Sequence, residues 1–191
     1  MIGGILLAAG QGRRFGGANK LLTPLADGTP VARAAAETLL EGGLDRCLAT
    51  VRPGEGQVIR SLREAGLEVL PCSASERGMG ASLAAGVAAL PRADGWLVAL
   101  GDMPWVAPAT VAGVAQALRD GALLAAPCHA GRGGHPVGFA AALGPELHAL
   151  DRDMGARSVV SVHRERMTWV SVTDPGIHRD VDEPGDIPAR I

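Results

Sequence analysis

Short apolar segments alternate along the chain with longer segments whose apolar residues recur at helical intervals. The short segments predict strands over residues 2–8, 45–51, 68–71, 95–100, 123–127 and 167–172. The helical intervals predict helices over residues 31–40, 57–65, 82–90 and 108–118, the last of which begins with a proline suited to a first turn. This alternation predicts the α/β class, with a mostly parallel sheet that carries helices on both faces.

The length of 191 residues fits a single domain over residues 1–191 with a full core. Hydrophobic residues make up 47% of the chain, yet no apolar run reaches the roughly 18 residues that span a bilayer. The first residues, MIGG, lack the basic region of an export signal. We therefore expect a soluble, cytoplasmic protein without a membrane partner.

Charge and cysteine content disfavour further classes of protein. Lys and Arg total 18 against 20 for Asp and Glu, so the net charge of −2 provides no basic footprint for nucleic acid. Aromatic residues make up only 3%, which disfavours a stacking platform for single strands. Cys47, Cys72 and Cys128 are far apart, show no zinc-type spacing and accompany strand-like segments, so we interpret them as structural thiols in a reducing compartment.

Four of the predicted strands are followed by loops that contain glycine. In a parallel α/β sheet, ligands bind beyond the carboxyl ends of the strands. The loops that follow Ala8, Leu70, Leu100 and Pro127 should therefore meet on one rim, and they contain the stretches GQGRRFGGANK, ERGMGAS, GDMP and GRGGHP. The functional site is predicted on this rim.

The first of these loops combines glycines with basic residues. Its glycines are spaced G-x-G-x-x-x-G from Gly10, which departs from the dinucleotide fingerprint, and a leucine follows Lys20 where a Walker loop needs Ser or Thr. Two interpretations remain. The glycine amides can approach a triphosphate that Arg13, Arg14 and Lys20 neutralise, or the loop is a solvated turn whose basic residues face water.

The stretch LLAAGQGRRFGGANKLL resembles the LAAG-x-G-x-R-(F/M)-G-x(n)-K signature of sugar-nucleotide-type nucleotidyltransferases, and especially that of the MobA-like NTP transferase family. The resemblance implies a single-domain Rossmann-like nucleotidyltransferase fold, with the acceptor-binding side at about residues 125–175. It also implies nucleotide contacts by Leu7, Ala8, Ala9, Gly10 and Gly12. Arg14 and Lys20 are implied to be catalytic, binding the phosphates and stabilising charge at the α-phosphorus.

Two acidic motifs are candidates for a metal site. Asp102 directly follows a buried strand, where its carboxylate can bind a hard cation or cap the helix after Pro104, and the local pattern leaves both open. Its GDMP motif resembles the family's metal-binding pattern, which implies a catalytic Mg²⁺ at Asp102. The later stretch RDVDEPGDI resembles the family's DIDTPEDL and implies Asp182 as second metal ligand, with Asp180 as the near alternative. An acidic surface turn is the other interpretation of that stretch.

Further motifs bear on the nucleotide. SERGMGASLAAG contains a glycine-rich turn that leads into a helix, and it resembles the G-M-G-x-S-L segment that completes the base pocket in the family. Gly78, Gly80 and Ser82 are therefore implied nucleotide contacts, while a simple helix cap is the alternative for Ser82. Family members that use CTP read LAAG where GTP users read LAGG, so residues 7–10 imply CTP, with the Ala9 methyl narrowing the pocket toward a pyrimidine.

GRGGHPVGF and DRDMGARSVV resemble the family's acceptor-side motifs. By this resemblance His135 and Pro136 shape the acceptor pocket and Arg157 holds the acceptor's phosphate. A structural histidine and an exposed helix charge are the alternatives. The combined motifs are most similar to those of molybdenum cofactor cytidylyltransferases, which implies transfer of CMP from CTP to the terminal phosphate of molybdopterin, with release of pyrophosphate.

Other functions remain compatible with the sequence. A cytidylyl- or uridylyltransferase for a sugar or polyol phosphate shares the LAAG motif. A non-catalytic chaperone of molybdoenzyme maturation would not need Arg14, Lys20 and Asp102 together, and a nicotinamide oxidoreductase would need another glycine spacing. The family leads us to expect CTP and molybdopterin as small-molecule partners and a molybdoenzyme or its chaperone as a protein partner. Positioning and charge stabilisation dominate phosphoryl-type transfer, so no protein nucleophile is expected.

Overall fold

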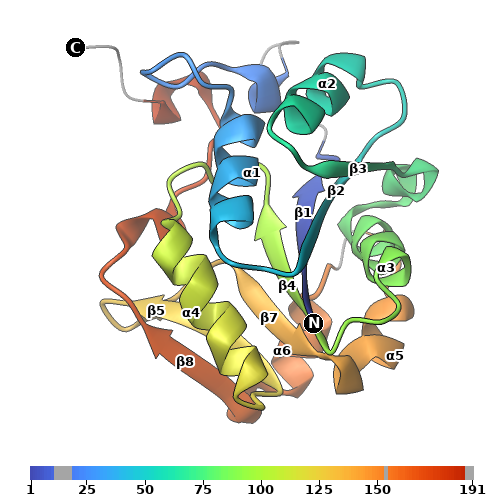
Figure 1. Cartoon of the computed structure of the whole chain (residues 1–191), viewed down its shortest axis with the longest axis vertical. Coiled ribbons are helices and arrows are strands. Elements are labelled where there is room, and N and C mark those ends of the chain that lie inside the picture. The colour runs from blue at the N-terminus through green and yellow to red at the C-terminus, as the bar shows by residue number, and fades with distance from the viewer. Residues whose placement is uncertain (11–18, 153–154, 188–191) are drawn as a thin grey trace.

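A sheet with β1 (Ile2–Ala8) in its interior organises the protein, which a computed structural model describes over residues 1–10, 19–152 and 155–187. Among these residues, eight strands form the sheet in the order β3-β2-β1-β4-β7-β5-β6, and β8 also pairs with β5. β1 runs parallel to β2 (Arg46–Val51) and β4 (Gly95–Leu100), and β3 (Glu68–Pro71) continues the parallel half beyond β2 (Figure 1). The carboxyl ends of these four strands therefore lie at one edge of the sheet.

The other half of the sheet is mixed. β7 (Val137–Ala140) lies antiparallel between β4 and β5 (Leu124–His129), β6 (Arg132–Gly133) pairs antiparallel with β5, and β8 (Met167–Ser171) pairs parallel with it. The six predicted strands are present, with ends shifted by at most two residues. The sequence did not predict β6 and β7, because both are short and lie in a glycine-rich stretch that is typical of a loop.

Helices cover both faces of the sheet, as the alternation predicts. α1 (Val31–Glu41), α2 (Gly56–Glu64) and α4 (Pro108–Arg119) pack on one face, in a cluster that contains Leu6. α3 (Met79–Ala89), α5 (Gly144–His148) and α6 (Arg157–Val162) pack on the other, in a cluster that contains Ile5. Ile5 and Leu6 face opposite helices because successive side chains of a strand alternate. Single 3-10 turns lie at Lys20–Leu22 (η1), Ser73–Arg77 (η2), Ala141–Leu143 (η3), Arg164–Arg166 (η5), Pro175–His178 (η6) and Pro184–Asp186 (η7).

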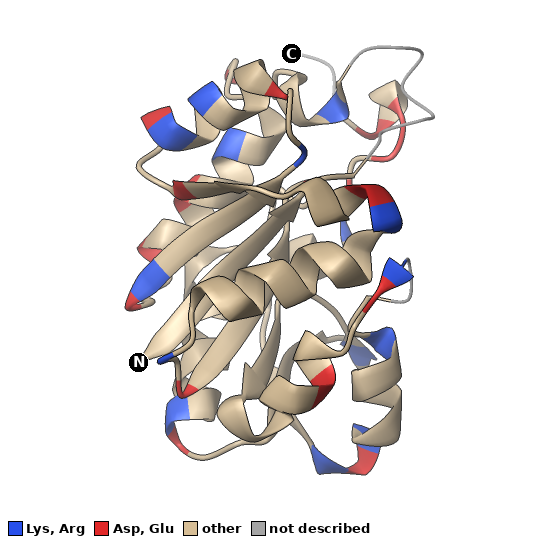
Figure 2. Cartoon of the chain, turned by 90° about the vertical axis from the view of Figure 1, so that its right-hand side faces the viewer, with Lys and Arg blue, Asp and Glu red and all other residues tan. Residues whose placement is uncertain are grey.

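Helix α3 begins at Met79 and not at Ser82, where the sequence predicted its start. Gly78 before it has a φ of +127°, which glycine adopts readily, and this lets the chain turn directly from η2 into the helix. A Cβ at Gly86 would lie 2.8 Å from Ile5 Cγ2, so α3 packs closely on β1. α3 contains no charged residue, and Figure 2 shows it as an uncharged helix with charged residues around it.

The three cysteines are unpaired in the fold, and one of them is largely buried. Cys47, Cys72 and Cys128 are free thiols, and burial raises the pKa of the Cys47 thiol to about 11, which keeps it protonated and unreactive. In the described part of the chain, no helix combines the length and apolar character that a membrane crossing requires.

Candidate active site

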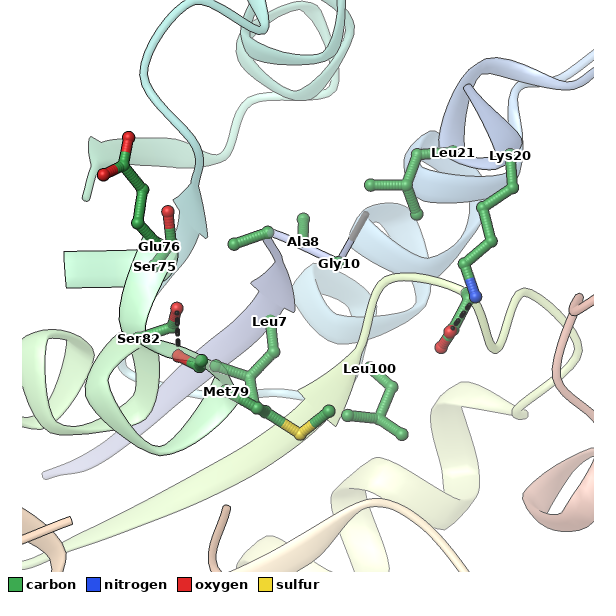
Figure 3. A pocket seen from close by; sticks show the side chains of 13 residues that line it. Leu7, Ala8, Gly10, Lys20, Leu21, Ser75, Glu76, Met79, Ser82 and Leu100 are labelled. Carbon is green, nitrogen blue, oxygen red and sulfur yellow. Dashed lines mark hydrogen bonds and ion pairs between the residues drawn. The ribbon is translucent and has the colours of Figure 1, made fainter. Parts of the chain in front are cut away.

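A cavity of about 370 Å³ opens at the carboxyl ends of β1 and β4, on the rim that the loop positions predict. Figure 3 shows Leu7 and Ala8 in its centre, Met79 and Ser82 of α3 on one side, and Lys20 on the other. Eight residues predicted for the site line it, namely Leu7, Ala8, Ala9, Gly10, Lys20, Gly78, Ser82 and Asp102. The remaining wall consists of Leu21, Ser75, Glu76, Met79 and Leu100. Gly12 and Arg14 lie outside the described residues.

Lys20 joins two carboxylates beside this cavity. Its Nζ lies 2.6 Å from Asp102 Oδ2 and 3.4 Å from Asp182 Oδ1, and Lys20 is only 8% exposed. Burial lowers the pKa of the Lys20 ammonium, but the hydrogen bond and charge of Asp102, followed by those of Asp182, outweigh burial and leave the pKa above its usual value. Lys20 is therefore a fixed positive charge at the rim.

The C-terminal segment brings Asp182 to Asp102. The Val181 amide donates to the Asp102 carbonyl over 2.8 Å, so the two acidic residues lie close together although they are far apart in sequence. The Asp186 carboxylate accepts the amides of Asp182 and Glu183, each over 2.7 Å, and so fixes the turn. These two hydrogen bonds lower the pKa of the Asp186 carboxyl. The acidic turn is thus held by its own backbone and carries Asp182 to Lys20.

The carboxylates of Asp102 and Asp182 suit a divalent cation. Both contact one ammonium, so they present hard oxygen ligands to the same point. Mg²⁺ is commonly held by one or two carboxylates, with phosphates and water completing its shell. Asp180, the alternative ligand, is exposed, and its charge acts on His135. No group of three or more His, Cys, Asp or Glu side chains is placed to hold a metal ion among the described residues.

The turn between η2 and α3 forms another wall of the cavity. Ser82 is 2% exposed, and its hydroxyl donates to the Gly78 carbonyl over 3.2 Å, so Ser82 lies inside α3 and does not cap it (Figure 3). Gly80 is not part of the cavity wall. A Cβ there would lie 2.9 Å from the Arg152 carbonyl oxygen and 3.0 Å from that of Asp151. Gly80 therefore allows α3 to pack closely against the backbone of Asp151 and Arg152. This packing role differs from the nucleotide contact that the motif implied for Gly80.

His135 and Pro136 lie behind the Asp102 loop, where they line a second, smaller cavity together with Met103. Burial lowers the pKa of His135, although the charges of Asp102 and Asp180 oppose this shift. The Nδ1 atom of His135 is buried without a hydrogen-bond partner in the described part of the chain. The lowered pKa favours the neutral imidazole, which can shape a pocket but is a weak general acid near neutral pH.

Arg157 does not reach the cavity. It is the exposed first residue of α6 and does not belong to the cavity wall. Gly155, two residues before it, lies closer to the cavity wall, because a Cβ at Gly155 would lie 3.5 Å from Sδ of Met79, a wall residue. The exposed-charge alternative for Arg157 agrees with this position.

Sequence reasoning missed polar residues that support the first loop. Arg52 Nη2 donates to the Ala9 carbonyl over 3.0 Å, and Glu55 accepts from Asn19 Nδ2 over 2.8 Å. Arg52 and Glu55 follow β2 directly, and that position at the carboxyl end of a predicted strand is the signal that could have found them.

A further missed residue is Asp174, which joins the C-terminal segment to α4. Its Oδ2 accepts the Ala107 amide over 2.8 Å and the Thr110 hydroxyl over 2.7 Å, and its Oδ1 accepts the Gly176 amide over 2.8 Å. This carboxylate caps α4 from a distant part of the chain, so no local sequence pattern reveals it.

Comparisons with known sequences agree with this geometry. A family model described as MobA-like NTP transferase domain matches residues 4–167. Among curated proteins, nicotine blue oxidoreductase from Paenarthrobacter nicotinovorans is 30% identical over 186 residues, which cover 94% of this chain and 91% of that protein.

Solved structures share the whole architecture. Rv0371c from Mycobacterium tuberculosis H37Rv has a TM-score of 0.84 and 31% identity, covering 97% of this chain and 94% of that chain. A complex of Rv0371C with manganese has a TM-score of 0.77 and 28% identity, covering 97% and 95%. A nucleotidyl transferase from Methanothermobacter thermautotroptrophicus has a TM-score of 0.82 and 25% identity, covering 97% and 94%.

Proposed function

The chain belongs to the MobA-like NTP transferase family, and we propose that it transfers CMP from CTP to the terminal phosphate of molybdopterin and releases pyrophosphate. One observation carries the proposal of nucleotidyl transfer: Lys20, Asp102 and Asp182 meet beside a cavity walled largely by small and aliphatic residues. Small residues let a nucleotide approach the backbone closely, and the charges lie where phosphates would react.

This reaction requires charge stabilisation and no protein nucleophile. An oxygen of the acceptor's terminal phosphate bonds to the α-phosphorus, and the bond from that phosphorus to the pyrophosphate oxygen breaks, so the electron pair leaves with pyrophosphate. A phosphate monoester is largely ionised near neutral pH and attacks without a general base. The lowered pKa of His135 fits this scheme, because a neutral His135 can bind or shape the acceptor site without transferring a proton.

The basic and the acidic residues have different roles in this proposal. Lys20, together with Arg14 in the first loop, neutralises the triphosphate and the charge that grows on the leaving pyrophosphate. Asp102 and Asp182 would hold Mg²⁺, which when bound supplies Lewis-acid stabilisation of phosphate oxygens. Rv0371C, a relative of similar structure, forms a complex with manganese, which supports a divalent cation as part of this proposal.

Small residues around Ala9 support the choice of CTP. Ala9 is half-buried in the cavity wall, so its methyl narrows the space that a glycine would leave for a larger base. Leu7, Ala8, Gly10 and Gly12 are proposed to complete the contacts on that side of the nucleotide. Gly78 and Ser82 are proposed contacts on the opposite wall, with Gly80 acting through packing.

Three residues are candidates for contact with the acceptor. His135 and Pro136 are proposed to shape its pocket from behind Asp102. Arg157 could contribute only to the far end of a large acceptor such as molybdopterin, because it is exposed and outside the cavity wall.

Pyrophosphate release tests this function. Wild-type protein is incubated with Mg²⁺ and molybdopterin, and CTP, GTP, UTP and ATP are compared in parallel, with Asp102→Asn as the inactive control. We expect turnover with CTP and none in the control. If CTP binds without turnover, sugar and polyol phosphates are tested as acceptors, and turnover with one of them would replace molybdopterin.

A second candidate function comes from one relative. Nicotine blue oxidoreductase is 30% identical across nearly the whole chain, which favours an oxidoreductase that binds a nucleotide-containing cofactor in the same cavity. The glycine spacing and the Lys20 cluster favour the transferase. Fluorescence titration with NADH and CTP separates the two: tight NADH binding with no CTP binding would support the oxidoreductase.

A further inference from the structure

The two described ends of the first loop are tied to one short segment after β2. Arg52 donates to the carbonyl of Ala9, where the loop begins, and Glu55 accepts from the side chain of Asn19, where it ends. The register of the sheet explains the first contact. Ala8 of β1 lies opposite Val51 of β2, so the next residues of the two parallel strands, Ala9 and Arg52, emerge side by side.

The second contact continues to Lys20 through Asn19. Asn19 Nδ2 binds Glu55, while Asn19 Oδ1 accepts the Leu21 amide over 3.0 Å and caps the η1 turn, whose first residue is Lys20. One amide side chain thus connects Glu55 to the backbone that carries Lys20. Ala9 and Lys20 both line the cavity, so each contact acts on a wall residue.

Arg52 is partly buried, which is energetically unfavourable for a guanidinium. The hydrogen bond to Ala9 accounts for this position. Its side chain is only 24% exposed, and its Nε is buried without a partner in the described part of the chain. Burying a guanidinium donor without a partner is unfavourable. The Arg52 Nη1 atom lies 4.0 Å from Glu55 Oε1, so the two charges offset each other next to a site for a triphosphate.

We propose that Arg52 and Glu55 are positioning residues for nucleotide binding, which act by fixing Ala9 and the Asn19–Lys20 turn at opposite ends of the first loop. Neither side chain belongs to the cavity wall. They act through the residues they hold, because a binding loop whose ends are fixed beforehand loses less conformational entropy when its ligand binds. This inference rests on the proposed function for its ligand, a nucleoside triphosphate.

Nucleotide affinity is the first test. Arg52→Met removes the donor and keeps much of the side-chain volume, and Arg52→Lys restores one donor. The control is Arg46→Met, at the opposite end of β2, where Arg46 pairs with Glu68 on the surface. Calorimetric titration with CTP and Mg²⁺ should show affinity about tenfold weaker for Arg52→Met, the size expected for one charge-assisted hydrogen bond. Arg52→Lys should recover most of the loss, and Arg46→Met should match wild type.

Amide hydrogen exchange tests the Glu55 contact without any nucleotide. Glu55→Ala removes the acceptor of Asn19 Nδ2, whereas Glu55→Gln keeps an oxygen acceptor at the same place. Exchange of the Leu21 amide should be several times faster in Glu55→Ala and close to wild type in Glu55→Gln. Thermal unfolding of both variants shows whether a change is local or global.

Two outcomes would overturn the inference. One is unchanged CTP affinity in Arg52→Met, or a loss that Arg46→Met shares. The other is unchanged Leu21 exchange in Glu55→Ala. Failure of the proposed function looks different: wild-type protein would bind no nucleoside triphosphate, while Leu21 exchange would still distinguish Glu55→Ala from Glu55→Gln.

Discussion

Lys20 donates a 2.6 Å hydrogen bond to Asp102, so the residue expected to bind phosphate is paired with the residue expected to bind metal. Asp182 joins the same ammonium at 3.4 Å. A divalent cation would need the carboxylate oxygens that Lys20 now contacts. If Asp102 and Asp182 hold a divalent cation, as proposed, Lys20 would compete with it for these oxygens until a triphosphate gives Lys20 another anion to bind.

Replacing Lys20 should strengthen metal binding in the absence of nucleotide. Lys20→Met leaves two carboxylates without their cation, so affinity for Mn²⁺ should rise by about tenfold, because one neighbouring positive charge is lost. Lys20→Arg keeps the charge and should show no such rise. Titration of nucleotide-free protein, followed by electron paramagnetic resonance of free Mn²⁺, measures the affinity. Unchanged or weaker Mn²⁺ binding in Lys20→Met would contradict the competition.

His135, whose Nδ1 atom is buried, should make the protein sensitive to acid. Burial lowers its folded-state pKa below the ordinary value of 6.5, so the unfolded chain binds the proton more readily. The contribution of a neutral His135 to stability is therefore complete above pH 6.5 and is lost as the pH falls below that value. His135→Asn should flatten the decline of the unfolding temperature below pH 6.5, and His148→Asn, at an exposed position on α5, should leave it as in wild type. Parallel declines in all three proteins would show that His135 does not cause the sensitivity.

The position of the site could be predicted from the sequence because it depends on connectivity. Apolar segments separated by helices imply parallel strands, and parallel strands bring their following loops to one edge. That reasoning placed Lys20 and Asp102 on one rim without any knowledge of side-chain contacts. The same reasoning did not predict the antiparallel strand β7, because Val137–Ala140 has only four residues, one of them glycine, and shows no alternation of apolar and polar residues.

Contacts that depend on strand register or on close packing could not be predicted from the sequence. Arg52 meets Ala9 only because Val51 pairs with Ala8, and no sequence pattern specifies that pairing. Gly80 and Gly78 belong to one motif, yet Gly78 lines the cavity and Gly80 packs against a distant backbone. A motif identifies that glycine is required there, and only the fold shows whether a ligand or another part of the chain is the reason.

Nucleotide choice should depend on Ala9. Ala9→Gly removes a methyl from the cavity wall, so a purine triphosphate should gain affinity relative to CTP, with discrimination reduced by about tenfold, the order expected for one methyl in a pocket. Competition between CTP and GTP in calorimetric titrations measures the ratio. A ratio equal to that of wild type would locate base selectivity elsewhere in the wall.

The C-terminal segment should be as important to the site as the glycine-rich loop, and Gly176 allows a direct test. A Cβ at Gly176 would lie 1.9 Å from the Trp105 carbonyl oxygen, in the loop that follows Asp102. Backbone cannot yield as a flexible side chain can, so Gly176→Ala should lower the free energy of unfolding by about 2 to 4 kcal/mol.

The same substitution should disturb the metal site, because the displaced segment carries Asp182 and binds the Asp102 carbonyl through Val181. The matched control is Gly185→Ala, a few residues further on, where a Cβ would meet nothing within 4 Å. Denaturant unfolding and the Mg²⁺ dependence of pyrophosphate release are measured on both variants. Gly176→Ala should need more Mg²⁺ for half-maximal release, and Gly185→Ala should behave as wild type. Lost stability with an unchanged Mg²⁺ requirement would mean that Asp182 keeps its position without this contact and that the segment only supports the fold.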